Sequence, residues 1–176
     1  MEEIGVYIIP STRAEVPKFS TEGSACFDIA ARFRKYYGGS TCYDEVQMYG
    51  PQNVLCKVTP TDGSIDIFPG YRVLVPTGLV LDIPEGYSVR LHPRSGSSLK
   101  SGIGLVNSEG IIDSDFTNEL MVMISLDSAT MATIRDGDRI CQGELVKNQP
   151  TSMKQIFYPP QQKTNRVGGF GSTGVV

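Results

Sequence analysis

Two patterns in this 176-residue chain predict an all-β fold, a jelly roll or β-sandwich. Short apolar or alternating runs recur between stretches rich in Gly, Pro, Asp and Asn, which is typical of strands joined by turns. Prolines at positions 60, 69, 76, 84 and 93 break the middle of the chain and argue against a long helix there. Two packed layers of strands are the architecture that both patterns favour.

Five apolar or alternating runs are the predicted strands, and no helix longer than a turn or two is expected. The runs cover residues 6–9, 71–75, 88–91, 120–126 and 142–146. The fourth run is apolar almost throughout, which predicts a strand buried on both faces. The length and apolar fraction of the chain fit one domain with its own core.

Residues 34–63 resemble neither a core strand nor a linker. In this segment Tyr37 and Tyr49 each precede a glycine, and two of the four cysteines lie here. The tyrosines and the apolar pair Val54 and Leu55 argue against disorder. We therefore expect an inserted hairpin or a long loop on the surface.

The net charge is −3, and acids and bases are mixed along the chain without a basic run. We therefore expect no stable binding to nucleic acid or to a membrane surface. The N-terminus lacks a basic region followed by an apolar run, and no stretch is long enough to cross a bilayer. These features predict a cytoplasmic protein, or one of the host cytoplasm or nucleus if the source is a virus.

The four cysteines are scattered along the chain and include no C-x-x-C pair. The single histidine, His92, cannot complete a zinc set with sequence neighbours. The spacing therefore predicts free thiols, as in a reducing compartment.

One turn gathers residues suited to phosphate. Arg94, Ser95 and Gly96 follow Pro93, and Lys100 lies a few residues on. Arginine, hydroxyls and accessible backbone N–H groups can cradle a phosphate. A plain surface turn is the alternative, because Ser/Gly clusters are common in turns.

A second polar cluster follows the apolar pair Ile111 and Ile112. Asp113 and Asp115 flank a serine, which is typical of a hairpin turn. The functional alternative is that Asp113, half-buried at the end of the apolar run, orients and deprotonates a water. Phe116 would then form a wall of the pocket.

Asp28 is a single acid inside an apolar run. Because a buried carboxylate is costly without a partner, it needs an arginine, backbone N–H groups or a hydrated Mg²⁺ nearby. A structural salt bridge is the commoner answer. Gln142 begins another run, and an inward-pointing amide there would also need a hydrogen-bond partner.

The chain ends in a glycine-rich arm, residues 166–174, followed by two valines. Glycines this dense cannot pack a core, so we expect the arm to be mobile until its N–H groups find a partner. Arg166, Ser172 and Thr173 offer charge and hydroxyls to phosphates, and Phe170 offers a face to a base. A lid over a nucleoside triphosphate is the functional interpretation, and a plain Gly/Ser tail is the alternative.

In order and spacing, five segments resemble the signature motifs of the trimeric dUTPases. The segments are residues 25–28, 93–96, 110–116, 137–142 and 168–174. Residues 69–70 and 75–79 also resemble the family. The likeness therefore covers nearly the whole chain outside 34–63.

The resemblance implies a jelly-roll subunit of a homotrimer, with residues 1–164 as the β domain and 34–63 as an insertion. Residues 165–176 would be the mobile arm that closes over the active site of a neighbouring subunit. The implied reaction is hydrolysis of dUTP to dUMP and pyrophosphate by in-line attack of water on the α-phosphorus, with Mg²⁺ on the triphosphate. It would keep uracil out of DNA and supply the precursor of dTMP.

The resemblance also implies roles for individual residues. Asp113 would activate the water, Asn107 would read the uracil edge, and Asp28 would anchor Mg²⁺ through waters. The phosphate-binding set is Arg94, Ser95, Gly96, Gln142, Arg166, Ser172 and Thr173. The set for uracil and deoxyribose is Asn107, Ile112, Phe116, Met121, Phe170 and Gly171.

The chain departs from the family pattern at a few positions. Phe116 stands where the family usually has tyrosine, so the phenol hydroxyl is lost while the ring can still pack beneath the deoxyribose. Arg166 stands one residue nearer the glycine pair than usual, which weakens its expected phosphate contact.

Two other functions are alternatives to dUTP hydrolysis. A dCTP deaminase shares the fold but needs a glutamate for proton transfer, and Met123 stands at the corresponding strand position. A regulatory protein on the dUTPase scaffold would bind a protein partner through residues 34–63, since tyrosine is favoured at interfaces.

Overall fold

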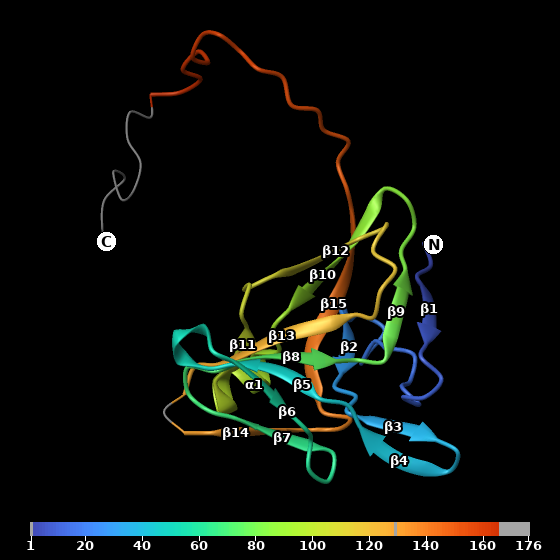
Figure 1. Ribbon diagram of the computed structural model, residues 1–176. Helices are drawn as coiled ribbons and strands as arrows, with labels where there is room; N and C mark the ends of the chain where they lie inside the picture. The colour runs from blue at the N-terminus through green and yellow to red at the C-terminus, as the bar shows by residue number, and fades with distance from the viewer. Residues whose placement is uncertain (1, 129, 166–176) are drawn as a thin grey trace.

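The computed structural model describes residues 2–128 and 130–165 of the chain (Figure 1). In these ranges nearly all regular structure is antiparallel β-sheet, as the sequence predicts. The helices there are α1 (Ser95–Ser101) and a 3-10 turn at Pro51–Asn53. Neither has the length and apolar character that a membrane span requires.

A four-stranded sheet, in the order β12-β10-β15-β2, carries parts of three of the five motif segments. Its strands are β12 (Gly110–Asp113), β10 (Tyr87–His92), β15 (Arg139–Lys147) and β2 (Phe27–Ala30). β10 lies between β12 and β15, and its register pairs Ser88 with Asp113 and His92 with Gln142.

A five-stranded sheet forms the second layer, in the order β11-β13-β8-β5-β6. Its strands are β11 (Ile103–Leu105), β13 (Met121–Leu126), β8 (Arg72–Pro76), β5 (Val46–Tyr49) and β6 (Leu55–Val58). Three two-stranded ladders complete the described part of the fold. They are β1 (Gly5–Ile8) with β9 (Leu79–Asp82), β7 (Ser64–Ile67) with β14 (Ala132–Arg135), and β3 (Arg34–Tyr37) with β4 (Ser40–Tyr43).

Both main sheets contribute alternate side chains to one hydrophobic core. Val89 and Leu91 of β10 and Val73 and Val75 of β8 are all buried there. Each such side chain stabilises the fold by about 1.5–3 kcal/mol through removal of apolar surface from water. The sandwich confirms the predicted jelly-roll class, and the outer face of the four-stranded sheet is left to carry polar residues.

All five predicted strands exist, with small shifts at their ends. The prediction that 120–126 is buried on both faces is wrong. Burial alternates along β13, so that Val122 and Ile124 are buried while Met123 is 42% exposed. Met123 makes the run apolar in the sequence, although its side chain lies on the outer face and is partly exposed to solvent.

The expectation that the whole of 34–63 lies on the surface is also wrong. β3 and β4 do form a separate hairpin, which Figure 1 shows projecting from the body. β5, however, pairs with β8 and buries Val46 and Met48 in the core. The second half of the segment is therefore part of the sandwich.

Beyond β15, residues 149–165 form no helix or strand and are exposed. Figure 1 shows this orange-to-red segment arching away from the body. Met153, Phe157 and Tyr158 are 96%, 82% and 83% exposed. An extended segment with uncovered apolar side chains is suited to packing on another surface.

Candidate functional site

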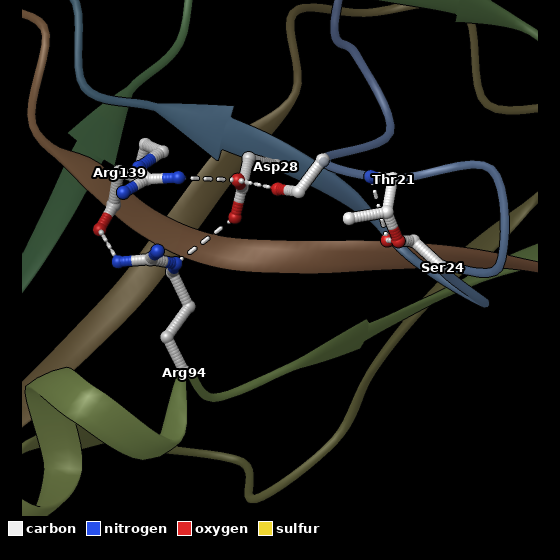
Figure 2. A network of polar contacts seen from close by, with 6 residues as sticks. Thr21, Ser24, Asp28, Arg94 and Arg139 are labelled. Atoms are coloured by element: carbon white, nitrogen blue, oxygen red, sulfur yellow. Dashed lines mark hydrogen bonds and ion pairs between the residues drawn. The ribbon is translucent and has the colours of Figure 1, made fainter.

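One carboxylate, that of Asp28, is held by two arginines at an edge of the four-stranded sheet (Figure 2). Arg94 Nε donates to Asp28 Oδ1 at 3.0 Å, and Arg139 Nη1 donates to Asp28 Oδ2 at 2.8 Å. Ser20 Oγ donates to the same Oδ2 at 3.1 Å. Arg94 Nη1 also donates to the backbone carbonyl of Arg139 at 3.4 Å. The salt bridge expected for Asp28 is therefore present twice.

Strand alternation places Asp28 on the outer face of the sheet. Its neighbours Phe27 and Ile29 are buried in the core, so the side chain between them points the other way. β15 pairs with β2 such that Gln142 lies opposite Asp28. Gln142 Nε2 in turn donates to the carbonyl of Pro93 at 3.5 Å, so the amide has a partner, although it lies on the outer face and does not point inward.

An irregularity in β15 brings Arg139 to this face as well. The register with β2 shifts between Arg139 and Cys141, and the adjacent Ile140 and Cys141 are both buried. Two consecutive buried residues break the alternation, as a β-bulge does, so Arg139 can face outward like Gln142. The sequence does not point to Arg139, because a bulge leaves no clear signal in the apolar pattern.

The electrostatics of this network favour the ionised carboxylate. Burial by itself raises the pKa of Asp28. The hydrogen bonds from Arg139 and Ser20 and the charges of Arg94 and Arg139 outweigh it, so the pKa lies below the ordinary value of 3.8. Two cations and one anion leave the cluster with a positive excess. Because a guanidinium has five N–H donors, both arginines keep donors for another anion.

Arg139 borders two cavities. One, of about 290 Å³, is lined by Arg94, Ser97 and Arg139 together with residues of β14 and β15. The other, of about 400 Å³, lies on the Asp28 side and includes Arg32 and Ser20 in its wall. Ser95 and Gly96 form the first turn of α1 directly after Arg94. The predicted phosphate turn is thus a helix start beside a cavity whose wall contains two arginines and Asp138.

The candidate residues for base, sugar and water lie along β12. Asn107 is in the turn before this strand, where its carbonyl accepts the Glu109 N–H at 2.6 Å. Asp113 is the last residue of β12 and is exposed, not half-buried as expected, because it lies at the open end of the strand; its carbonyl accepts the Phe116 N–H at 3.1 Å. Phe116 is 38% exposed.

The turn at Asp113 is not a hairpin, contrary to the simple interpretation of the sequence. β12 pairs with β10, and the chain after Asp113 crosses to β13 in the other sheet. Met121 is the first residue of β13 and lies opposite Pro76. Ile112 is half-buried in β12, packed against the core.

Within one chain, the candidate catalytic residue Asp113 lies far from the candidate phosphate-binding residue Arg94. Asp113 lies opposite Ser88 near the start of β10, whereas Arg94 follows His92 at the end of that strand. Four residue steps along a strand separate Ser88 from His92, a distance of roughly 13 Å. The structure thus groups Asp28, Arg94 and Gln142 at one end of β10 and places Asp113 at the other.

The remaining predicted site residues lie in the C-terminal arm. Arg166, Phe170, Gly171, Ser172 and Thr173 are outside the described residues. Their roles stay predictions.

Comparison with known proteins identifies relatives of the chain. The family model described as dUTPase matches residues 60–174. A deoxyuridine 5'-triphosphate nucleotidohydrolase of Finegoldia magna is 34% identical over 96% of this chain and 98% of its own length. Its counterpart in Fusobacterium nucleatum is 33% identical over 99% of both chains.

Solved structures share the fold. A variant dUTPase of Staphylococcus bacteriophage 80alpha, solved with dUpNHpp, has a TM-score of 0.74 at 19% identity and covers 99% of this chain and 100% of its own. A variant dUTPase from phage phi11 of S. aureus, described with a coordinated structural Mg(II) ion, has a TM-score of 0.63 at 18% identity, covering 89% and 98%. These comparisons support neither the deaminase nor the regulatory alternative.

Proposed function

The chain belongs to the dUTPase family, and we propose that it hydrolyses dUTP to dUMP and pyrophosphate. The structural observation that supports this assignment is the arginine pair on Asp28, which joins three of the predicted motif segments, 25–28, 93–96 and 137–142. It offers guanidinium donors beside a cavity, which is what a triphosphate requires.

We assign phosphate binding to Arg94, Ser95, Gly96 and Gln142, with Arg139 added from the structure. Asp28 fixes the planes of both guanidinium groups before substrate arrives, so little ordering is needed when phosphate binds. Charge that develops on the phosphate oxygens during reaction would meet donors already in place. Arg166, Ser172 and Thr173 of the arm complete the proposed phosphate set.

We assign activation of the attacking water to Asp113. Its carboxylate ends β12 at an exposed position, where a water can reach it. A carboxylate there can orient the water in line with the bond to pyrophosphate and take its proton as the water oxygen bonds to the α-phosphorus. The electron pair of the broken P–O bond leaves with pyrophosphate.

Base and sugar selection is assigned to the residues around β12. The Asn107 amide would pair with the O4 and N3–H edge of uracil and refuse the reversed pattern of cytosine. Phe116, with Ile112 and Met121, would pack against the deoxyribose and leave no room for a 2'-hydroxyl. Phe170 and Gly171 of the arm would cover the uracil.

We include Mg²⁺ as a cofactor that enters with the nucleotide. Three donors already bind the Asp28 carboxylate, which has about four acceptor positions. One position is therefore left for a metal-bound water, and the two arginines disfavour a bare cation there. When bound, Mg²⁺ would neutralise charge on the triphosphate oxygens.

We propose that the complete site is shared between subunits of a homotrimer. The support is the separation of Asp113 from Arg94 along β10. Residues 149–165 are exposed and could extend roughly 50 Å, enough to bring the arm onto a neighbouring subunit. A cytoplasmic location is part of the proposal, because the cysteines are free thiols.

The test is to offer the purified protein dUTP, UTP, dTTP and dCTP with Mg²⁺ and to identify every product. We expect pyrophosphate from dUTP alone, with dUMP as the second product. In oxygen-18 water the label should enter dUMP and not pyrophosphate, which locates the attack on the α-phosphorus. Uracil nucleotides formed from dCTP, or no turnover of dUTP, would refute the proposal.

A further inference from the structure

The outer face of the four-stranded sheet carries a second chemical cluster beside the arginine network. Cys26 directly precedes β2, His92 ends β10, and Glu144 lies in β15 between them. The pairing of Gly143 with Phe27 places Glu144 opposite Cys26, and the pairing of His92 with Gln142 places the imidazole one diagonal away. The strands of three distant segments therefore bring these side chains together.

The ligand atoms of Cys26, His92 and Glu144 all lie within 4.8 Å of one another. His92 Nε2 is 3.2 Å from Glu144 Oε2. Ligand atoms about 2.0–2.3 Å from a tetrahedral metal ion lie about 3.3–3.8 Å from one another, so the His92 and Glu144 atoms are already close enough and the widest separation would have to shrink by about 1 Å. Small side-chain rotations would suffice, and all three residues are half-buried.

The groups behind His92 are placed near the position of the outer support that a metal-bound histidine usually has. Glu109 Oε1 lies 3.9 Å from His92 Nδ1, the ring nitrogen turned away from Glu144. Arg90 Nη1 is 3.5 Å from Glu109 Oε2 and holds that carboxylate in place. The 3.9 Å separation is longer than a hydrogen bond, but a small approach of Glu109 would let it accept from Nδ1–H and favour the tautomer in which Nε2 can bind a metal.

We propose that Cys26, His92 and Glu144 form a Zn²⁺ site with one coordination position left for water. Sulfur, imidazole nitrogen and carboxylate oxygen are a ligand set that suits Zn²⁺ and not Mg²⁺. A thiolate and a carboxylate would balance the charge of the ion. The bound metal would tie β2, β10 and β15 together and, through Glu109, steady the turn that carries Asn107. Metal binding at these three residues does not depend on the proposed hydrolase function and can be measured without substrate.

The experiment uses the full-length protein, treated with chelator and kept free of nucleotide and Mg²⁺. Co²⁺ is added as a spectroscopic substitute for Zn²⁺. We expect one Co²⁺ per chain, with a thiolate-to-cobalt charge-transfer band and the visible bands of a tetrahedral site, and stoichiometric displacement by Zn²⁺. Absence of the thiolate band in the wild-type protein would overturn the proposal.

Variants make the assignment specific. Cys26→Ser should abolish the charge-transfer band, and His92→Gln should weaken Zn²⁺ binding strongly. Cys56→Ser is the matched control, because that half-buried thiol lies in β6 of the other sheet and should change nothing. Glu109→Gln should lower the Zn²⁺ affinity about 10–100-fold if it supports the histidine. A Cys26→Ser protein that is folded by circular dichroism and keeps the band would refute the site.

Discussion

Asp28 accepts hydrogen bonds from two guanidinium groups, one just before α1 and one at the first residue of β15. Without the carboxylate, two cations would face each other, the half-buried Arg94 and the exposed Arg139. The arginines would then either repel each other or turn toward solvent. In both cases the donors assigned to phosphate would lose their fixed orientation.

We predict that Asp28→Asn lowers the free energy of unfolding by on the order of 1–3 kcal/mol and also lowers turnover of dUTP. The stability loss depends on pH. Because the pKa of Asp28 lies below 3.8, its charge stabilises the fold fully above that value. The contribution disappears as the pH falls through the lower pKa of the folded state. Urea unfolding of both proteins across the acid range measures this.

Asp44→Asn is the control for that prediction. Asp44 pairs with Lys35 on the surface and is 62% exposed, so the loss should be within about 1 kcal/mol. A difference between wild-type and Asp28→Asn proteins that stayed constant down to the lowest pH would contradict the role of the charge.

We predict that Asp113→Asn keeps dUTP binding but lowers the rate of hydrolysis by about 10²–10⁴-fold, the usual contribution of a general base. Calorimetric binding and single-turnover kinetics separate the two effects. Asp115→Asn, two residues away and exposed, should hydrolyse dUTP at nearly the wild-type rate. If the two variants behaved in the opposite way, the role would belong to Asp115.

At the scale of single residues, the sequence predicted that Asp28 needs a partner, because an acid inside an apolar run can be recognised from the sequence alone. It did not reveal Arg139 as that partner. The side of a strand on which Arg139 lies depends on the bulge before Cys141, and the apolar pattern there is uninterrupted. Strand faces cannot be assigned through a bulge by counting residues.

At the scale of elements, α1 positions Arg94, and Gly102 ends α1. Gly102 adopts φ +65°, and its N–H donates to the carbonyls of Ser97 and Ser98. A Cβ at this position would lie 2.2 Å from the carbonyl oxygen of Asp127. Backbone conformation and space therefore both require glycine here.

We predict that Gly102→Ala destabilises the protein by more than about 1 kcal/mol, through strain at positive φ and the clash with Asp127. The displaced helix should also raise the KM for dUTP. Thermal unfolding and steady-state kinetics check this. Gly104→Ala is the control, because a Cβ there meets nothing within 4 Å. Equal melting temperatures for the two variants would contradict the argument.

Long alternating or apolar runs allowed five strands to be predicted, whereas β5 and β6 were not predicted as strands. Each has only four residues, and each is flanked by tyrosine, glycine or proline typical of loops. A run this short carries about one repeat of the alternation, and the polar Gln47 in β5 and Lys57 in β6 interrupt the continuous apolar run by which the equally short β1 was predicted. The pairing of β5 with β8, a tertiary contact, is what makes this segment a strand, and β6 then pairs with β5.

At the scale of the whole molecule, a shared site makes a distinctive prediction about mixed subunits. Asp113→Asn and Arg94→Gln proteins should each be nearly inactive as pure assemblies. When they are refolded together, random mixing would give about a quarter of the sites one intact Asp113 and one intact Arg94 from different subunits. Activity should recover to that extent, measured as dUMP formed per chain.

Size-exclusion chromatography of each pure variant is the control for that mixing, because the assembly must persist. Activity no greater than the sum of the two separate variants would show that each chain carries a complete site of its own. The same result would leave the family assignment untouched, since that rests on the sequence match.

The sequence could suggest which motif residues belong to the active site, but not which of them lie close together within one chain. Cys26 and His92 lie far apart in the chain, and the sequence argued against a metal set, yet strand register makes them neighbours. Likewise, Asp113 and Arg94 belong to nearby motifs and are separated by the length of β10. Register is fixed by the packing of the whole sandwich, which no local pattern encodes.

The exposed segment of residues 149–165 has a consequence for how the protein responds to its own concentration. Met153, Phe157 and Tyr158 are uncovered in the single chain. If assembly covers them and completes the active site together, activity per chain should fall on dilution below the dissociation constant of the trimer. The amount of protein in a cell would then set both how much catalyst is present and what fraction of it can work.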